Sequence, residues 1–193
     1  MTHSEAARIA FDVVLCSWVV LESWIRLRSR VNRHGSRRDR GTLLVVLASV
    51  GVGLGGAVVL AGNVHPAAIG DGRRLFFVAG LVLMSAGIAI RLWAVALLGR
   101  FFTIDVRVHA GHTVVERGPY RWVRHPAYAG LILTFTGIGL ALGNWAALAV
   151  LAVVPTAGLL VRIHFEERAL LDGLGETYGR FAAGRPRLFP GLW

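Results

Sequence analysis

Long runs of apolar residues, separated by short polar segments, constrain the fold of this chain more than any other feature. The two longest runs cover residues 43–61 and 75–98, and each is long enough to cross a bilayer as a helix. Hydrophobic residues make up 55% of the 193 residues, above the usual share in soluble domains. Three shorter runs have the same character: residues 9–25, 127–142 and 145–161. The sequence therefore predicts an all-α, polytopic membrane protein with about five transmembrane helices, the last two forming a C-terminal helical hairpin.

The 21 basic residues are all arginine, and most of them fall on one side of the predicted spans. Seven lie between the first two runs, at positions 26, 28, 30, 33, 37, 38 and 40. Five spans place 17 arginines on one side and only Arg8, Arg73 and Arg74 on the other. This asymmetry predicts a multi-pass protein of the cell membrane with its N-terminus outside and its C-terminus in the cytoplasm. Because the run 26–40 lies between two spans, contact with membrane lipids is favoured over contact with nucleic acid.

Single residues interrupt the apolar runs. Asp12 and Glu22 lie near the ends of the first run, so we favour their placement at the membrane interface. For Arg91, near the end of the third run, an interfacial position and a position facing a polar cavity both remain open.

Cys16 is the only cysteine, which excludes an intramolecular disulfide. No basic segment precedes the first run, so we expect no cleaved signal peptide.

The second run contains a glycine pattern that imitates a dinucleotide-binding motif. Gly51, Gly53 and Gly56 form G-x-G-x-x-G, but such a site requires a preceding strand, and these glycines lie inside an apolar helix. We therefore interpret Gly51 and Gly55 as a surface for packing between membrane helices. Three glycines of the predicted hairpin are expected to pack in the same way: Gly137, Gly139 and Gly143.

Polar chemistry is concentrated in residues 118–130, before the fourth apolar run. His125 precedes Pro126, which disfavours helical angles at His125 and suits the first turn of a helix at Pro126. The sequence predicts a helix that begins at Pro126, with Tyr128 and Gly130 in its first turn. Free N–H groups there suit an anionic group of a ligand. The alternative is a membrane-interface anchor made of arginine and aromatic residues.

Residues 99–124 are polar for this chain and include a stretch with strand character, 102–108. His109 and His112 lie in this segment and His125 follows it. No acidic or cysteine ligand accompanies them at a recognisable spacing, so no metal site is predicted.

Charged residues continue beyond the last apolar run. Arg162 and Glu166 are four residues apart, so they share a helix face and are able to pair. The alternative is a charged amphipathic helix on the membrane surface.

Taken together, these motifs resemble those of the isoprenylcysteine carboxyl methyltransferase family. The matching elements are Gly118-Pro119-Tyr120, Arg124-His125-Pro126-Ala127-Tyr128-Ala129-Gly130, Glu166-Glu167 with Leu170, and Gly175-Glu176-Thr177-Tyr178. They lie within residues 91–190, about half of the chain. The resemblance implies an integral membrane enzyme that uses S-adenosylmethionine. It implies one domain over residues 1–193, with three N-terminal spans (1–98), a cytoplasmic-side cofactor loop (99–126), the helical hairpin (127–161), and a cytoplasmic C-terminal helix and tail (162–193).

The resemblance also implies roles for single residues. The implied cofactor-binding residues are His112, Thr113, Val114, Val115, Tyr120, His125, Pro126, Ala127, Tyr128 and Glu166. Arg162 is implied to bind the methyl acceptor, and Arg162 and Glu166 form the implied catalytic pair.

These residue types suit methyl transfer to a carboxylate. A carboxylate, with a reference pKa of about 4, is ionised at neutral pH and needs no general base. Arg162 offers a planar fork that binds it with two hydrogen bonds, and Glu166 is placed to orient that fork or to bind the cofactor. The predicted function is therefore carboxyl methylation of a lipophilic small molecule or lipid-modified acceptor that arrives through the membrane lipids.

Two other functions remain open. A phospholipid or other lipid amine N-methyltransferase shares the same loop and the paired glutamates, but it requires a base, for which Glu166, Glu167 or His125 is available. The second alternative is a non-catalytic membrane scaffold.

Overall fold

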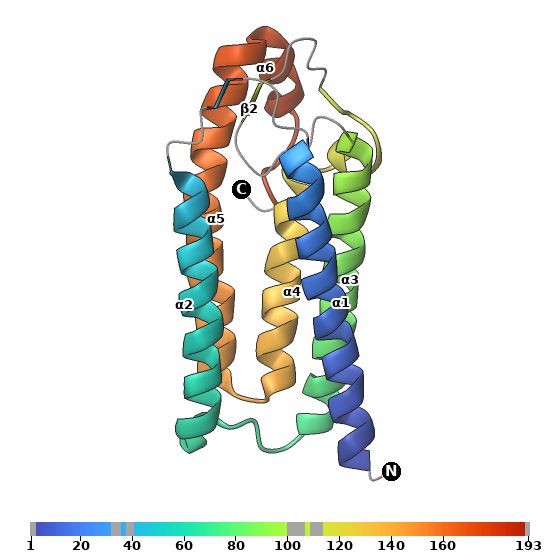
Figure 1. Cartoon of the computed structure of the whole chain (residues 1–193), viewed down its shortest axis with the longest axis vertical. Coiled ribbons are helices and arrows are strands. Elements are labelled where there is room, and N and C mark those ends of the chain that lie inside the picture. The colour runs from blue at the N-terminus through green and yellow to red at the C-terminus, as the bar shows by residue number, and fades with distance from the viewer. Residues whose placement is uncertain (1–2, 32–35, 38–40, 100–106, 109–113, 192–193) are drawn as a thin grey trace.

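The computed structural model describes residues 3–31, 36–37, 41–99, 107–108 and 114–191, and these are mostly helical (Figure 1). The α-helices are α1 (His3–Val31), α2 (Thr42–Asn63), α3 (Arg73–Leu98), α4 (Pro126–Leu142), α5 (Trp145–Leu174) and α6 (Glu176–Ala183). Two 3-10 helices, η1 (His65–Ala67) and η3 (Gly118–Arg121), and an antiparallel pair of two-residue strands, β1 (Ser36–Arg37) and β2 (Arg107–Val108), join them. The predicted helical class is confirmed, and β2 falls in the stretch predicted to have strand character.

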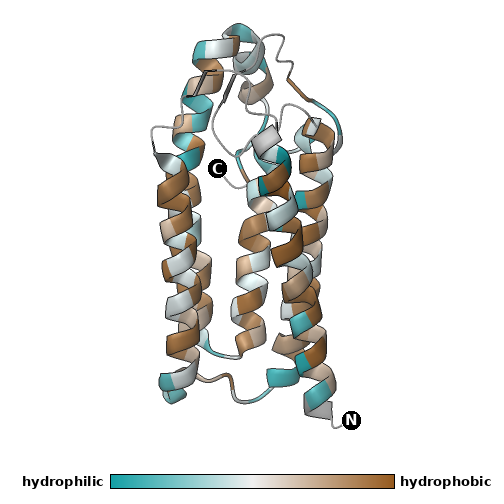
Figure 2. Ribbon diagram, in the orientation of Figure 1, coloured by the Kyte–Doolittle hydropathy of each residue, from teal (hydrophilic) through white to brown (hydrophobic). Residues whose placement is uncertain are grey.

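Helices α1 to α5 run alongside one another down the long axis of the molecule (Figure 1). The N-terminus, the α2–α3 connection and the α4–α5 turn lie at one end, while α6 and the two strands lie at the other. Hydrophobic residues are frequent along the middle of the helices, and hydrophilic residues lie toward both ends of the bundle, including the α6 end (Figure 2). Three segments predicted to be cytoplasmic, which contain β1, η3 and α6, therefore meet at one end of the bundle.

Among the described residues, three helices are long and apolar enough to cross a membrane: α2, α3 and α5. Helix α4 is apolar but has only 17 residues, so the count of five spans stays a prediction. Helix α5 continues past its apolar part, residues 145–161, into a charged extension, residues 162–174. Arg162 hydrogen-bonds Thr42, the first residue of α2, so the rest of this extension projects beyond the start of α2.

Local sequence explains where α4 begins and ends. Pro126 is its first residue, as predicted, and His125 before it has non-helical angles (φ −124°, ψ 58°). Gly143 ends the helix with φ 69°, a left-handed conformation that glycine adopts without strain. The Asn144 side chain then caps α5 by accepting hydrogen bonds from two first-turn N–H groups at 2.9 and 3.1 Å. Its amide also donates to the Val64 carbonyl, which ties this turn to the end of α2.

Paired glycines allow α3 and α4 to approach closely. A Cβ added at Gly80 would lie 2.7 Å from the carbonyl oxygen of Gly137, and one added at Gly87 would lie 2.5 Å from that of Gly130. Gly80 and Gly87 are seven residues apart on α3, and their partners Gly137 and Gly130 are seven residues apart on α4, in the opposite order. The glycines therefore lie on one face of each helix. Any side chain at these positions would separate the helices.

Helix α2 packs against α5 through glycine, but not through the glycines predicted. A Cβ added at Gly53 would lie 2.9 Å from the Pro155 side chain, and Ala57, one turn on, is fully buried. Gly51 and Gly55 face open space. The prediction for that pair is wrong because the neighbouring small pair, with the same four-residue spacing, faces α5 instead.

The hairpin glycines divide into two groups. Gly139 does pack inside the hairpin, since an added Cβ would lie 2.6 Å from the Cα of Leu148 on α5, and Gly143 forms the turn. The prediction for Gly137 is wrong because this residue faces α3.

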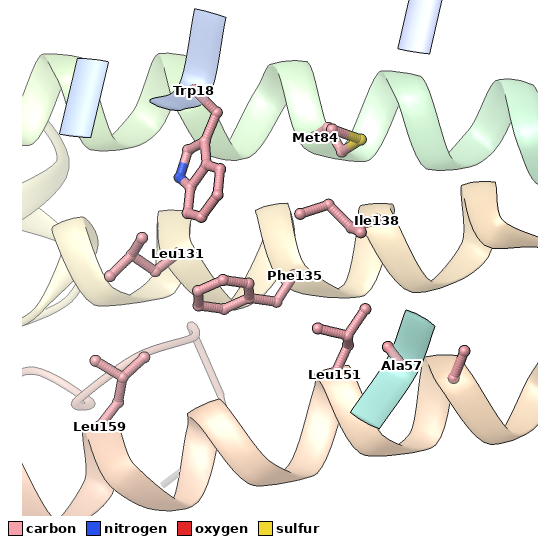
Figure 3. Close-up of a cluster of buried hydrophobic side chains, with 9 residues drawn as sticks. Trp18, Ala57, Met84, Leu131, Phe135, Ile138, Leu151 and Leu159 are labelled. Atoms are coloured by element: carbon pink, nitrogen blue, oxygen red, sulfur yellow. The ribbon is translucent and has the colours of Figure 1, made fainter. Parts of the chain in front are cut away.

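A cluster of buried apolar side chains fills the centre of the bundle (Figure 3). Its members are Trp18, Ala57, Met84, Leu131, Phe135, Ile138, Ala147, Leu151 and Leu159. Trp18 of α1 meets Phe135 of α4 edge to face, with ring centroids 5.7 Å apart. Part of this cluster also forms the wall of a cavity at the candidate site.

Candidate active site

The C-terminal tail is hydrogen-bonded to the loop that precedes α4. The N–H of Arg124 donates to the Pro186 carbonyl at 3.0 Å, and the N–H of His125 donates to the Arg187 carbonyl at 2.9 Å. The Arg124 side chain also donates to the Arg185 carbonyl at 2.7 Å. These bonds attach the Arg-His-Pro motif, residues 124–126, to the C-terminal tail.

Glu167, in the charged extension of α5, links the same two segments. Its carboxylate accepts hydrogen bonds from Arg124 Nη1 at 2.8 Å and Arg187 Nε at 2.9 Å, and His125 Nε2 lies 3.3 Å away. Burial by itself raises the pKa of Glu167, but the hydrogen bond and electrostatic attraction of His125, together with Arg187 and Arg124, lower it to about 2. Glu167 is therefore ionised at neutral pH and holds three segments together.

Tyr128 lies between the two residues predicted to be catalytic. Its O–H donates to Glu166 Oε2 at 2.6 Å, and Arg162 Nε donates to the Tyr128 oxygen at 2.9 Å. Arg162 is only 4% exposed and also donates through Nη1 to the hydroxyl of Thr42 at 3.2 Å. The sequence predicted that Arg162 and Glu166 share a helix face, and in the structure the Tyr128 hydroxyl bridges them.

His125 is buried and stacks on Tyr128, with ring centroids 5.6 Å apart and an interplanar angle of 21°. Its carbonyl accepts hydrogen bonds from the N–H groups of Tyr128 and Ala129, at 3.0 and 3.1 Å. These two N–H groups of the first turn are therefore not available to an anionic ligand.

Tyr120, another residue implied to bind the cofactor, is buried in an apolar cluster beside α3. Its O–H lies 3.5 Å from the Ala94 carbonyl, to which it donates. Burial, and then the negative charge of Glu166, raise the pKa of Tyr120 well above its ordinary value. The phenol is therefore neutral at physiological pH.

Other implied cofactor residues surround this region. The structure describes Val114 and Val115, which are partly buried, and Pro126 and Ala127, which are buried. His112 and Thr113 lie outside the described residues, as does His109. Within the described ranges, no three His, Cys, Asp or Glu side chains are grouped as metal ligands would be.

Glu22 and Arg91 form a buried ion pair between α1 and α3. Arg91 donates to the Glu22 carboxylate through both Nε and Nη2, the latter at 2.8 Å, and its Nη1 donates to the Ala127 carbonyl at 3.2 Å. Glu22 therefore faces the protein interior, where a buried arginine stabilises its charge, and its placement near the membrane interface stays a prediction. Arg91 faces a polar cavity, which is one of the two alternatives that the sequence left open.

That cavity has a volume of about 230 Å³ and is lined by α1 to α5. Its apolar part consists of Val19, Leu131, Leu159, the aromatic rings of Trp18 and Phe135, and four aliphatic side chains of α2. The polar lining residues are Glu22, Ser23, Arg26, Arg91, Tyr128 and Arg162. The cavity is thus amphipathic, and the Arg162–Tyr128 contact forms part of its polar wall.

Residues 79–172 match the model of the isoprenylcysteine carboxyl methyltransferase (ICMT) family. The matched part, just under half of the chain, is called the ICMT region below because it is similar to this family. The resemblance inferred from the sequence motifs is thereby confirmed. The ICMT region contains Arg91, the Arg-His-Pro motif and the charged residues at the start of the α5 extension.

Curated relatives match the chain over similar lengths. It is 34% identical over 91 residues to the uncharacterized protein YpbQ of Bacillus subtilis, covering 47% of this chain and 54% of that protein. It is 33% identical over 105 residues to a probable protein-S-isoprenylcysteine O-methyltransferase of Oryza sativa subsp. indica, covering 53% and 55%. It is 35% identical over 71 residues to the methanethiol S-methyltransferase of Mycobacterium tuberculosis, covering 37% and 28%. The chain spans about half the length of the first two relatives.

Several site residues lie outside the ICMT region and were not identified from the sequence. Thr42 meets Arg162 across 120 positions, and Arg187 meets Glu167 across 20. Nothing in the linear pattern connects these partners. Glu22 did carry a signal, since a carboxylate inside an apolar run often faces the protein interior.

Proposed function

We propose that this chain is an integral membrane enzyme that transfers a methyl group from S-adenosylmethionine to the carboxylate of a lipophilic acceptor. Its ICMT region supports this activity, as do relatives named protein-S-isoprenylcysteine O-methyltransferase in rice and Arabidopsis. The whole chain forms one domain with five spans, and the active site lies on the cytoplasmic side. The gathering of β1, η3 and α6 at one end of the bundle supports this orientation.

The hydrogen-bonded series Arg162–Tyr128–Glu166 is the observation that carries the proposal. Arg162 lines the polar end of the cavity, and Tyr128 connects it to Glu166 through bonds of 2.9 and 2.6 Å. A buried guanidinium above an apolar cavity suits an acceptor that has a carboxylate at one end and an apolar chain at the other. The series links this acceptor site to the Arg-His-Pro loop.

The residues beyond Tyr128 fit S-adenosylmethionine. The Glu166 carboxylate accepts hydrogen bonds from hydroxyl or ammonium groups, both of which this cofactor carries, and the stacked rings of His125 and Tyr128 provide a flat surface beside it. We assign cofactor binding to Val114, Val115, Tyr120, His125, Pro126, Ala127, Tyr128 and Glu166, with His112 and Thr113 outside the described residues. When bound, the cofactor supplies an electrophilic methyl group on a positively charged sulfur.

The protein's own part in the reaction is to align and shield the acceptor. Arg162 holds the ionised carboxylate with an oxygen directed at the methyl group, and no proton has to be removed. Tyr128 keeps Arg162 and Glu166 in register. Trp18 and Phe135 line the apolar part of the cavity, where the acceptor's apolar chain and these rings together displace water and so strengthen the electrostatic contacts beside them. The apolar chain of the acceptor occupies the remainder of the cavity.

Labelled methyl transfer tests this proposal. The purified protein in lipid nanodiscs is incubated with methyl-labelled S-adenosylmethionine and a membrane-lipid extract. We expect a labelled lipid-soluble product that releases methanol in mild base, as a methyl ester does. A base-stable product would replace the proposal with amine methylation. Absence of both transfer and calorimetric cofactor binding would leave only a scaffold role.

A further inference from the structure

The loop that precedes α4 has a buried side and an exposed side. Pro119, Tyr120 and Val123 are buried, whereas Arg121 and Trp122 between them are exposed. The sequence left two interpretations open for this stretch, a ligand site and a membrane-interface anchor. The burial pattern gives each interpretation its own residues. The buried side belongs to the candidate active site, and the exposed side faces the surroundings of the bundle.

The exposed ring of Trp122 packs against α3. It meets the ring of Trp93 edge to face, with centroids 6.4 Å apart, and the two residues are 56% and 47% exposed. Gly118 seats the loop on the same part of α3. Its φ is 59°, and an added Cβ would collide with Leu97 and lie 3.3 Å from the Trp93 ring. The two tryptophans therefore form one aromatic surface that is fixed to the outside of α3.

The position of Trp93 along α3 fits the edge of a bilayer. This helix is one of the three that are long and apolar enough to cross a membrane, and it begins with Arg73 and Arg74. Residues 75–92 extend over about 27 Å at roughly 1.5 Å per residue, close to the roughly 30 Å of a hydrocarbon core. Tryptophan is enriched at membrane–water interfaces. We therefore expect the Trp93–Trp122 pair at the level of the lipid headgroups.

Two arginines beside this pair carry charges that the protein does not neutralise. Arg117 and Arg121 directly precede the two loop residues that touch α3. Both are exposed, and within the described ranges neither guanidinium has a hydrogen-bond, ion-pair or ring partner. The neighbouring acid, Glu116, is bound by Arg185 Nη2 at 2.9 Å. The aromatic surface is thus flanked by an excess of positive charge.

We propose that Trp93, Trp122, Arg117 and Arg121 form a binding surface for the headgroup of an anionic phospholipid. The arginines bind the phosphate, and the rings lie against the glycerol and the first carbons of the chains. A second copy of the chain fits this surface less well, because a two-fold contact would bring the same unpaired arginines together. A bound lipid holds the outer side of the loop whose inner side carries Tyr120. The proposal depends on a bundle that spans a membrane, and it does not depend on methyl transfer.

Photo-crosslinking in nanodiscs tests this surface. The probes are phosphatidylglycerol, which is anionic, and phosphatidylcholine, which is zwitterionic, each with a diazirine at the same acyl carbon near the glycerol. Each probe is added at the same mole fraction to phosphatidylcholine nanodiscs, and mass spectrometry quantifies its products within residues 92–97 and 117–123. We expect the anionic probe to label these residues at least about fivefold more, the factor that one arginine near a membrane surface contributes. Added salt should lower this ratio, because it screens exposed charges.

Variants of the two arginines assign the preference to this surface. Arg117→Gln with Arg121→Gln should bring the ratio of the two probes to within about twofold of one. Arg117→Lys with Arg121→Lys keeps both charges and should retain most of the preference. Arg180→Gln is the matched control, because Arg180 is also exposed and without a partner among the described residues, but lies on α6 at the end of the molecule. It should leave the ratio unchanged.

Three results would overturn the proposal. One is a wild-type ratio within about twofold of one, and another is an unchanged ratio in a folded double glutamine variant, with folding checked by its Tm. The third is a disulfide between two copies at Trp122→Cys in a Cys16→Ser background, together with loss of lipid labelling in nanodiscs that hold two copies. That result would make a second copy of the chain the occupant.

These measurements require no turnover. A lipid preference at this surface without any methyl ester would overturn the proposed function and leave the lipid site standing. Methyl ester formation with a probe ratio close to one would do the reverse.

Discussion

The Tyr128 hydroxyl donates a 2.6 Å hydrogen bond to Glu166, so one short contact joins the first turn of α4 to the charged extension of α5. The same hydroxyl accepts a hydrogen bond from Arg162. Neither α4 nor α5 alone holds the candidate catalytic groups in position. The site depends on the closeness of two helices that follow one another in the chain.

Tyr128→Phe removes this bridge and keeps the ring. We expect cofactor affinity and methyl transfer each to fall by about ten- to a hundredfold, since a hydrogen bond to a charged group contributes roughly 1.5–3 kcal/mol. Tyr178→Phe is the matched control, because the Tyr178 hydroxyl is buried without a hydrogen-bond partner among the described residues. Calorimetry and labelled methyl transfer measure both effects. Equal behaviour of the two variants would contradict the bridging role.

Arg162→Lys keeps the positive charge but loses the planar fork. Methyl transfer should fall at least about tenfold while cofactor affinity stays within about threefold, because Arg162 contacts the acceptor in the proposed mechanism. Glu166→Gln keeps the shape and removes the charge, so it should lower both quantities. Full turnover in Arg162→Lys would remove the main support for a carboxylate acceptor.

Glu167 predicts a specific loss of stability in acid. Its folded pKa of about 2 lies below the ordinary value of 4.5, so its contribution is complete above pH 4.5 and is lost as the pH falls through about 2. Above pH 4.5 it amounts to roughly 3 kcal/mol. Glu167→Gln should therefore lower the Tm at pH 7, and its difference from the wild type should shrink between pH 4.5 and 2. A difference independent of pH would contradict an ionised Glu167.

The glycine contacts between α3 and α4 predict an asymmetric response to added methyl groups. A Cβ at Gly130 would lie 2.6 Å from the Gly87 carbonyl oxygen, whereas one at Gly55 would meet nothing within 4 Å. Gly130→Ala should destabilise the protein by roughly 1–3 kcal/mol, and Gly55→Ala should be neutral or slightly stabilising. Thermal unfolding in detergent measures both, and similar Tm values would argue against the close approach of the two helices.

The topology is testable by cysteine labelling in a Cys16→Ser background. A cysteine introduced at Ser36 should be shielded from an impermeant thiol reagent in intact cells, because the arginine asymmetry predicts that residues 26–40 lie in the cytoplasm. A cysteine at Asp71, in the α2–α3 connection at the opposite end of the bundle, should react readily. The reverse pattern would invert the proposed orientation.

Local rules predicted the parts of the fold that depend on neighbouring residues. Pro126 starts α4 because its fixed backbone angle suits a first turn, and Gly143 ends it because the turn needs a left-handed residue. Where two pairs of small residues on one helix have the same spacing, the sequence does not indicate which pair packs against another helix. Gly51 with Gly55 and Gly53 with Ala57 have the same spacing, and only the position of α5 decides which pair is buried.

The candidate site was predictable as a set of residues but not as a set of contacts. Helix periodicity placed Arg162 and Glu166 on one face, yet it does not say that a tyrosine of another helix stands between them. The pairing of Glu22 with Arg91 spans 69 positions and two helices. Such contacts depend on which helix faces meet, and this is set by packing throughout the bundle.

The hydrogen bonds between the tail and the Arg-His-Pro loop have a consequence for the order of events during synthesis of the protein. Arg185, whose carbonyl receives a hydrogen bond from Arg124, leaves the ribosome 61 residues after it. At a synthesis rate of roughly 5–20 residues per second, Arg185 is added roughly 3–12 seconds after Arg124. The long helices are therefore synthesised before the site can close. A nascent chain halted before residue 185 already contains every long helix of the bundle and still has an unfinished site.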